Sequence, residues 1–90
     1  MATMYALAEE VPLRTCSLAE LARGVVAKVT RVDEPGASGE RLMELGLISG
    51  AKVRVVRRGL FGDPLQIEVR GTMLSLRKAQ AERIALTLLG

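Results

Sequence analysis

Few of the side chains that carry out enzyme chemistry are present in this sequence. The chain of 90 residues contains no His and no Trp, and it has one Cys, one Tyr and one Phe. A nucleophilic Ser or Cys needs a base beside it, and without His that base would have to be a perturbed Lys or carboxylate. Ser17, Ser38 and Ser49 stand where helix caps and turns explain them. We therefore expect no catalytic residues and no enzymatic activity.

Acidic side chains are the remaining candidates for a metal site, because metals are otherwise held by His and clustered Cys. The candidate pairs are Asp33 with Glu34 and Glu40 with Glu44. The second pair is four residues apart on a predicted helix, where like charges repel weakly, and no third ligand is evident. The glycines form neither a Walker phosphate loop nor a dinucleotide-binding motif. We expect no metal site, weak or no affinity for Fe²⁺, and no cofactor.

Basic side chains are numerous enough to raise nucleic-acid binding as a possible function. The formal net charge is +3. A basic band on the exterior could be formed by Arg54, Arg57, Arg58, Arg70, Arg77 and Lys78. Such a band leaves a small nucleic-acid-binding barrel as an alternative, but single-strand binders stack bases on aromatic rings and the chain offers only Tyr5 and Phe61. Outward arginines that keep strands soluble are the other explanation, and we expect no nucleic-acid partner.

The composition is that of one small folded domain. Hydrophobic residues make up 49% of the chain and charged residues 26%, which is ordinary for a globular protein. No run of eighteen apolar residues is present, so no membrane span is expected. Cys16 has no partner for an internal disulfide, which fits a reducing compartment, and its simplest role is that of a small apolar residue. These features predict a cytoplasmic protein.

The first helix marks the predicted start of the domain. Residues 1–16 are predicted to be a flexible N-terminal extension, because Pro12 and the paired acids before it interrupt any helix there. Residues 17–90 are predicted to form the domain. Ser17 and Glu20 have the spacing of a capping box, and Gly24 supplies a left-handed stop for a helix over about 18–23.

A second short helix and several strands follow. The helix is predicted over about 40–45 and ends at Gly46, and Gly50 suits the second central position of a type II turn. Five strands are predicted over about 25–32, 52–55, 65–70, 73–77 and 84–89, with a tight hairpin at Gly71 and a helical turn near 79–83. The sequence therefore predicts a mainly β fold, a small closed five-stranded barrel with two or three short helical insertions.

The predicted core of this barrel is aliphatic. It consists of Leu18, Leu21, Val26, Val29, Val32, Leu42, Leu45, Val53, Val55, Leu65, Ile67, Val69, Leu74, Leu76, Ile84 and Leu86. Burial of an aliphatic side chain stabilises a fold by about 1.5–3 kcal/mol, so a core of this size needs no disulfide or metal.

The loop over residues 57–64 contains the only aromatic residue outside the N-terminal extension. Gly62, Asp63 and Pro64 give it turn chemistry, since Gly permits a positive φ and Pro ends a ladder. Leu60 and Phe61 have two interpretations: they plug the mouth of the barrel, or they are exposed and form a protein-contact site.

Taken together, three strings give the sequence a family resemblance. They are R-L-M-E-L-G-L-I-S-G over 41–50, G-D-P-L over 62–65, and L-S-L-R over 74–77. With Leu18-Ala19-Glu20-Leu21 and Gly24, they resemble the ferrous iron transport protein A (FeoA) family over residues 17–89. Ser49 departs from the family, which usually has Pro before the turn Gly.

The resemblance implies an SH3-like β-barrel with inserted helices. It also implies a non-enzymatic cytoplasmic accessory of the FeoB membrane transporter, whose cytoplasmic part is a GTP-binding domain, and an effect on the assembly or activity of that transporter. Candidate contact residues are Arg57, Arg58, Leu60 and Phe61 in the loop and Met43 and Leu47 around the second helix. An iron sensor or carrier is a third possibility that the scarcity of ligands disfavours. For the apolar candidate contact residues, the alternative role is packing in the core.

Overall fold

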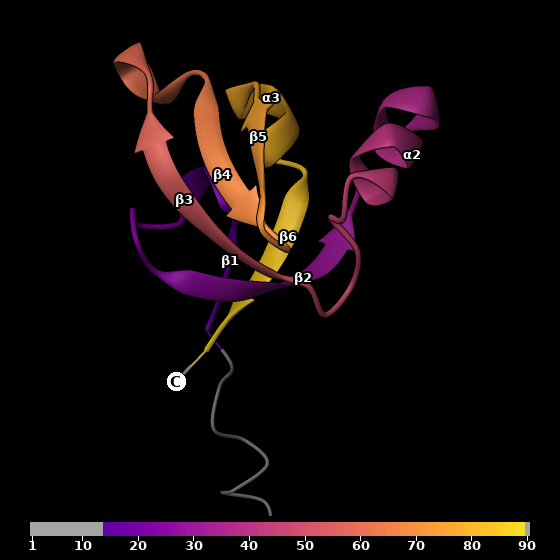
Figure 1. Ribbon diagram of the computed structural model, residues 1–90, viewed down its shortest axis with the longest axis horizontal. Coiled ribbons are helices and arrows are strands. Elements are labelled where there is room, and N and C mark those ends of the chain that lie inside the picture. Colours follow the sequence, from indigo (N-terminus) through magenta and orange to yellow (C-terminus); the bar gives the residue numbers. More distant parts are fainter. Residues whose placement is uncertain (1–13, 90) are drawn as a thin grey trace, which may run out of the picture.

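The computed structural model describes residues 14–89, which form a curved antiparallel sheet with short helical segments at its margins (Figure 1). The strands are β1 (Thr15–Ser17), β2 (Val26–Val32), β3 (Lys52–Arg58), β4 (Leu65–Val69), β5 (Thr72–Leu76) and β6 (Ile84–Leu88). The helical segments are the 3-10 turns η1 (Leu18–Glu20) and η2 (Leu60–Gly62) and the α-helices α2 (Gly36–Glu44) and α3 (Lys78–Ala81). The predicted mainly β architecture is confirmed, with one strand more than the five expected.

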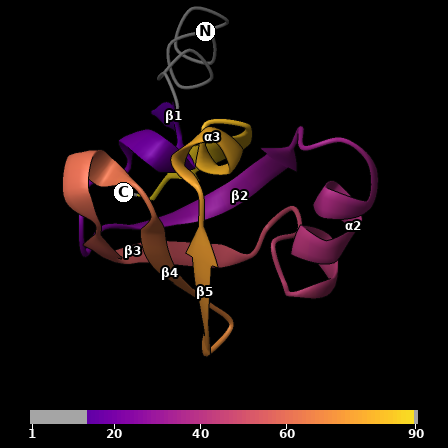
Figure 2. The ribbon, with the colours of Figure 1, turned by 90° about the horizontal axis from the view of Figure 1, so that it is seen from above.

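The six strands form one sheet in the order β1-β6-β2-β3-β4-β5, and every neighbouring pair is antiparallel. The register shifts between Val29 and Arg31 in β2 and between Val55 and Arg57 in β3. Such bulges increase the local twist, and both strands bend around the core (Figure 2). Within residues 14–89, β1 and β5 are the two edges of the sheet, and no ladder joins them. The sheet therefore curls without the hydrogen-bonded closure that the sequence suggested.

The described structure includes three residues that the sequence placed in the N-terminal extension, Arg14, Thr15 and Cys16. Thr15 and Cys16 lie in β1 and pair with Thr87 and Leu86 of β6. The three-residue strand is too short to show a period-two pattern, which explains why sequence reasoning missed it. The rest of the predicted extension, residues 1–13, lies outside the described residues.

The core is aliphatic, as predicted, but its membership differs at the bulge and at the helix end. The buried residues are Leu18, Leu21, Ala27, Val29, Leu42, Leu47, Ala51, Val53, Val55, Leu65, Ile67, Val69, Leu76, Ala81, Ile84 and Leu86. Val26 was expected inside but is 39% exposed, because Ala27 and Val29 hold the inner face of β2. Beyond the bulge the alternation of inward and outward side chains shifts by one residue, and Val32 packs against the edge of the core. Leu45 is exposed, and Leu47 is buried in its place.

The helix α2 begins earlier than the sequence indicated. It starts at Gly36, directly after Pro35, so residues before the predicted start at 40 form its first turn. Gly39 packs against the main chain before the helix: a Cβ at this position would lie 1.9 Å from the carbonyl oxygen of Glu34. Ser38 lies inside the helix, and its Oγ accepts a hydrogen bond of 3.2 Å from Gln80 Nε2 of α3. This contact links α2 to α3.

The β4–β5 hairpin turns one residue earlier than predicted. Its two central residues are Arg70 and Gly71, with φ of +53° and +78°, and Val69 pairs with Thr72. Positive φ at both central positions is the type I′ geometry, which matches the twist of an antiparallel pair. The five glycines assigned to caps and turns all have positive φ: Gly24, Gly46, Gly50, Gly62 and Gly71.

Candidate partner-binding surface

The loop between β3 and β4 presents two large apolar side chains to solvent. Leu60 is 78% exposed and Phe61 is 87% exposed, so neither plugs the interior of the sheet. In Figure 1 the η2 turn stands at the far end of the β3–β4 pair. We call these two residues the apolar tip. Side chains of this size at the end of a loop are typical of protein contacts.

The main chain around the apolar tip is tightly closed. The Gly59 N–H donates to the Pro64 carbonyl over 2.8 Å, and a Cβ at Gly59 would lie 2.6 Å from the Asp63 carbonyl oxygen. Phe61 has a φ of +59°, a left-handed conformation that is uncommon for a bulky residue. The loop thus holds the ring of Phe61 away from the core, on a main chain that is strained at this residue.

Asp63 connects the apolar tip to α3. Its Oδ1 accepts a hydrogen bond of 3.1 Å from the Lys78 N–H, and its Oδ2 lies 3.3 Å from an Arg77 guanidinium nitrogen. A carboxylate at the first N–H groups of a helix satisfies donors that have no partner within the helix. The sequence predicted a turn role for Asp63, and its bond to a residue fifteen positions away was not visible there.

The two arginines next to the apolar tip have different roles. Arg57 is exposed, and its guanidinium donates to Gln66 Oε1 over 2.6 and 3.0 Å. Arg58 is partly buried and donates to the carbonyl oxygens of Ala19 and Leu21 over 2.8 and 2.5 Å. Arg58 therefore holds the η1 segment against β3, which leaves Arg57 as the arginine available to a partner.

An open hollow lies between these arginines and the η1 segment. It has a volume of about 510 Å³. Its lining consists of Ala19, Glu20, Leu21, Ala22, Arg23, Arg57 and Arg58. With three arginines against one glutamate, the hollow is basic, so an acidic side chain of a partner that contacts the apolar tip would find opposite charge there.

Of the two contact residues predicted around the second helix, one lies on the surface and the other in the core. Met43 is 44% exposed, whereas Leu47 is completely buried, so its side chain cannot contact a partner. The chain turns inward after Gly46, and the Leu47 N–H donates to the Leu42 carbonyl over 3.0 Å. Leu45 and Ile48 are exposed beside Met43. We call Met43, Leu45 and Ile48 the α2 surface. Helical spacing alone could not predict that Leu45 and Ile48 are exposed to solvent.

The apolar tip and the α2 surface do not meet. The η2 turn and α2 stand at opposite ends of the molecule in both ribbon views (Figures 1 and 2). One small ligand therefore cannot bridge them. They are two separate candidate contact sites, of which the apolar tip is the more exposed.

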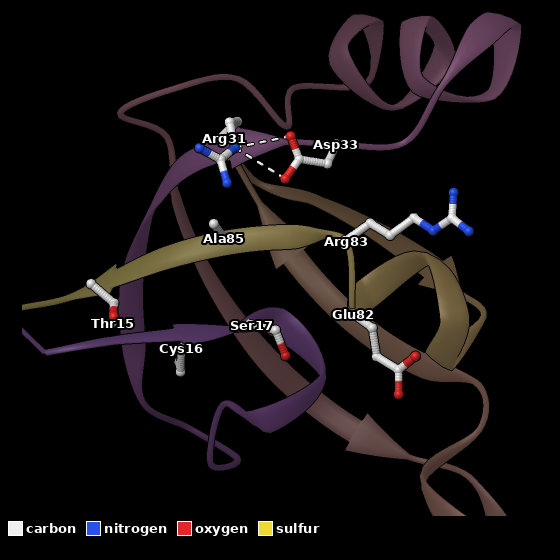
Figure 3. Close-up of a pocket in the computed structure, with 8 residues that line it drawn as sticks. All are labelled: Thr15, Cys16, Ser17, Arg31, Asp33, Glu82, Arg83 and Ala85. Carbon is white, nitrogen blue, oxygen red and sulfur yellow. Dashed lines mark hydrogen bonds and ion pairs between the residues drawn. The ribbon is translucent and has the colours of Figure 1, made fainter.

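A second hollow, shown in Figure 3, is lined by charged residues and Cys16. It has a volume of about 280 Å³ and contains an ion pair of 2.9 Å between Arg31 and Asp33. Burial, and secondarily the charge of Glu20, raises the pKa of the Cys16 thiol above its ordinary value. A thiol with a raised pKa is a poor nucleophile at neutral pH. In the described part of the chain, no group of three or more His, Cys, Asp or Glu side chains is placed to hold a metal ion.

The family is shown by comparison with known proteins. The FeoA domain family model matches residues 16–88. The chain belongs to the FeoA domain family. The FeoA protein of Chlorobium tepidum has a solution structure with 40% identity and a TM-score of 0.78, covering 82% of this chain and 70% of that one. Stenotrophomonas maltophilia FeoA, solved with zinc and described as a procaryotic SH3 domain protein, has 35% identity and a TM-score of 0.69 over 78% and 87% of the two chains. The SH3-like fold that the resemblance implied is confirmed.

A curated relative extends the comparison to a transporter. The Fe(2+) transport protein A/Fe(2+) transporter FeoB fusion protein of Porphyromonas gingivalis is 31% identical over 72 residues. The match covers 80% of this chain but only 8% of the fusion protein. The crystal structure of T. acidophilum IdeR shares the fold alone, at 19% identity and a TM-score of 0.72. In residues 14–89 no helix is long and apolar enough to cross a membrane.

Proposed function

We propose that this FeoA-family chain is a non-enzymatic accessory of ferrous iron uptake. It binds the cytoplasmic side of a FeoB-type transporter and modulates the assembly or activity of that transporter. Its place is the cytoplasm, and the transporter recruits it to the inner face of the membrane. No cofactor or metal takes part in the binding.

The fusion relative is the observation that carries this proposal. In that protein, by its name, a transport protein A and a FeoB transporter form one polypeptide. Covalent linkage raises the effective concentration of one part near the other, which suits two parts that work in contact. Such a contact also needs a surface that contributes affinity. The apolar tip, with Arg57 beside it, provides such a surface.

The charge distribution favours this function over nucleic-acid binding. Arg54 pairs with Glu68 over 2.6 Å, and Arg77 pairs with Asp63 over 3.3 Å. Arg58 is committed to main-chain carbonyls. Half of the predicted basic side chains are therefore already engaged within the protein, which leaves fewer of them free to contact phosphates.

Copurification tests the proposal. A tagged chain, expressed at native level and isolated from membranes of its own cell, is expected to bring a FeoB-type transporter with it. Phe61→Asp removes the aromatic ring and adds a charge at a largely exposed position, so the variant should fold but recover much less transporter. Leu89→Asp, at an exposed apolar residue outside the candidate contact surfaces, serves as the matched control. Recovery of no transporter by the unaltered chain would refute the proposed partner.

A further inference from the structure

The edge strand β5 lacks the features that usually protect the edge of a sheet. It pairs with β4 alone, and the β4–β5 register runs through five residue pairs without a bulge. Its sequence, T-M-L-S-L, has no charged residue and no Pro. Proteins commonly protect edges with charges, Pro, bulges or very short strands. The opposite edge, β1, is only three residues long. Among the described strands, β5 is thus the edge best suited to accept another strand.

The register of the hairpin shows which main-chain groups face outward. Val69 and Thr72 flank the two-residue turn, and residues at this position exchange both of their N–H···O bonds. Hydrogen-bonded and non-hydrogen-bonded pairs alternate along the ladder, so the main-chain N–H and C=O groups of Met73 and Ser75 point away from β4. In residues 14–89 no hydrogen bond to these outward groups is found. In both ribbon views β4 lies on one side of β5 and α2 stands on the other, so the free edge faces the α2 side (Figures 1 and 2).

The side chains of β5 offer apolar contacts on both faces of an added strand. Met73 is 54% exposed on the outer face. Leu74 points to the opposite face and is partly buried against the core. An added strand with apolar or β-branched residues at its centre would cover both side chains, since cross-strand neighbours contact one another.

Basic residues stand at both ends of β5. Arg70 lies in the turn before it, and Arg77 and Lys78 follow it; all three are exposed. Arg77 has an ion pair with Asp63, but its side chain remains 74% exposed. If two copies of this chain paired antiparallel about Leu74, Arg70 of one copy would face Lys78 of the other. Like charges in register are destabilising, so the flanks disfavour a second copy and favour an acidic strand.

We propose that the β5 edge binds an extended, acidic segment of another protein by strand addition. The segment has apolar or β-branched residues at its centre and Asp or Glu at both ends. Its main chain bonds to Met73 and Ser75, and its acidic ends meet Arg70, Arg77 and Lys78. This site involves neither the apolar tip nor the α2 surface, so it stands independently of the proposed transporter contact.

A synthetic peptide is the probe. It has about nine residues, the length that spans 70–78 at about 3.3 Å per residue, with alternating Val and Thr at the centre and Asp at both ends. Titration into the full chain, followed by NMR, is expected to shift the amides of Met73 and Ser75 most strongly. Affinity should fall as salt rises, because the ends bind by charge.

Three comparisons make the test specific. The same peptide with N-methyl groups on alternate amides keeps its side chains but cannot form the ladder, so binding should be lost. The paired change Arg70→Glu, Lys78→Glu should weaken binding roughly tenfold, because exposed ion pairs contribute modestly each. Phe61→Asp, in the apolar tip, should leave peptide affinity unchanged.

Four results would overturn the proposal. They are absence of binding at millimolar peptide, equal binding of the N-methylated peptide, equal binding of a peptide with Lys at both ends, and shifts centred on Leu60 and Phe61. A concentration-dependent dimer with protected Met73 and Ser75 amides would likewise contradict it, because a second copy would then occupy the edge.

Discussion

At the scale of single residues, Phe61 combines two unfavourable features, exposure of an aromatic ring and a left-handed main chain. A left-handed conformation costs a non-glycine residue about 1–2 kcal/mol. We therefore predict that Phe61→Gly has a larger free energy of unfolding than Phe61→Ala by about 1 kcal/mol, because only Gly adopts this φ without strain. Urea denaturation of the two variants measures the difference. Equal stability would show that the strain is absent.

Both variants remove the ring, so both are expected to lose affinity for the transporter to the same extent. Stability and binding would then respond to different properties of Phe61, its main chain and its side chain. A Gly variant that keeps full affinity would show that the aromatic ring is not part of the contact.

Cys16 gives a prediction on pH. Burial and the charge of Glu20 raise the pKa of its thiol above the ordinary value in the folded chain, so the folded state holds the thiol proton more tightly than the unfolded state. The stabilisation that this provides is fully present below the ordinary thiol pKa of the unfolded chain and is lost as pH rises through the raised pKa of the folded chain. Relative to Cys16→Ser, the native chain should lose stability over that alkaline range. Denaturation curves across that range measure it.

Alkylation provides the complementary measurement. At pH 8 to 9, iodoacetamide should modify Cys16 more slowly in the folded chain than in urea, because the thiolate is the reactive form. Equal rates in the two states would contradict a raised pKa.

At the scale of elements, α2 depends on the close packing of Gly39 against the main chain of Glu34. A methyl group at Gly39 would overlap the Glu34 carbonyl oxygen, and main-chain atoms cannot move aside easily. We predict that Gly39→Ala destabilises the fold by about 2–3 kcal/mol, the upper part of the usual range for overpacking. Thermal or urea unfolding tests this.

Gly36→Ala is the matched control in the same helix. A Cβ at Gly36 would meet nothing within 4 Å, so the change costs only the strain of its positive φ, about 1 kcal/mol. A Gly39→Ala variant no less stable than this control would show that α2 can shift away from the Glu34 main chain at little cost.

The η1 segment depends on Arg58 in a similar way. Its guanidinium satisfies the carbonyl oxygens of Ala19 and Leu21, and hydrogen bonds to charged groups contribute about 1.5–3 kcal/mol. Arg58→Met should lower the free energy of unfolding by about 2 kcal/mol and speed amide hydrogen exchange around η1. Arg57→Met, on the exposed side of the same strand, should change stability little. Equal effects of the two substitutions would remove the distinction drawn between these arginines.

The elements also show how far sequence reasoning reached. Alternation placed β4 because its five residues follow period two without interruption. It misplaced Val26 because the bulge at Val29 and Arg31 shifts the faces within β2, and a bulge depends on the partner strand. The inward turn that buries Leu47 and exposes Leu45 follows from the main chain at Gly46, which helical spacing does not describe.

The candidate site was predicted in composition but not in geometry. The sequence named Leu60 and Phe61 and left open whether they lie inside or outside, because apolar character is the same in both cases. Only the tertiary arrangement, which directs η2 beyond the end of β3, decides it. Nothing in the order of residues showed that Arg58 reaches back thirty-nine positions to Ala19.

At the scale of the whole molecule, the candidate contact surfaces lie apart. The apolar tip is at one end, α2 is at the other, and the β5 edge lies between them (Figure 2). Each surface can therefore be altered without disturbing the others, since distant sites contribute independently. This separation allows binding data on single variants to be assigned to one surface.

The central proposal is tested most directly by titrating the cytoplasmic part of a FeoB-type transporter with each of three proteins and comparing their affinities. The unaltered chain, Phe61→Asp and Met43→Asp are compared at one salt concentration, with folding of each verified by NMR. We expect the unaltered chain and Met43→Asp to bind alike and Phe61→Asp to bind at least roughly tenfold more weakly, as loss of an aromatic anchor implies. Equal affinity of all three folded proteins, or no binding by any of them, would contradict a transporter contact through the apolar tip.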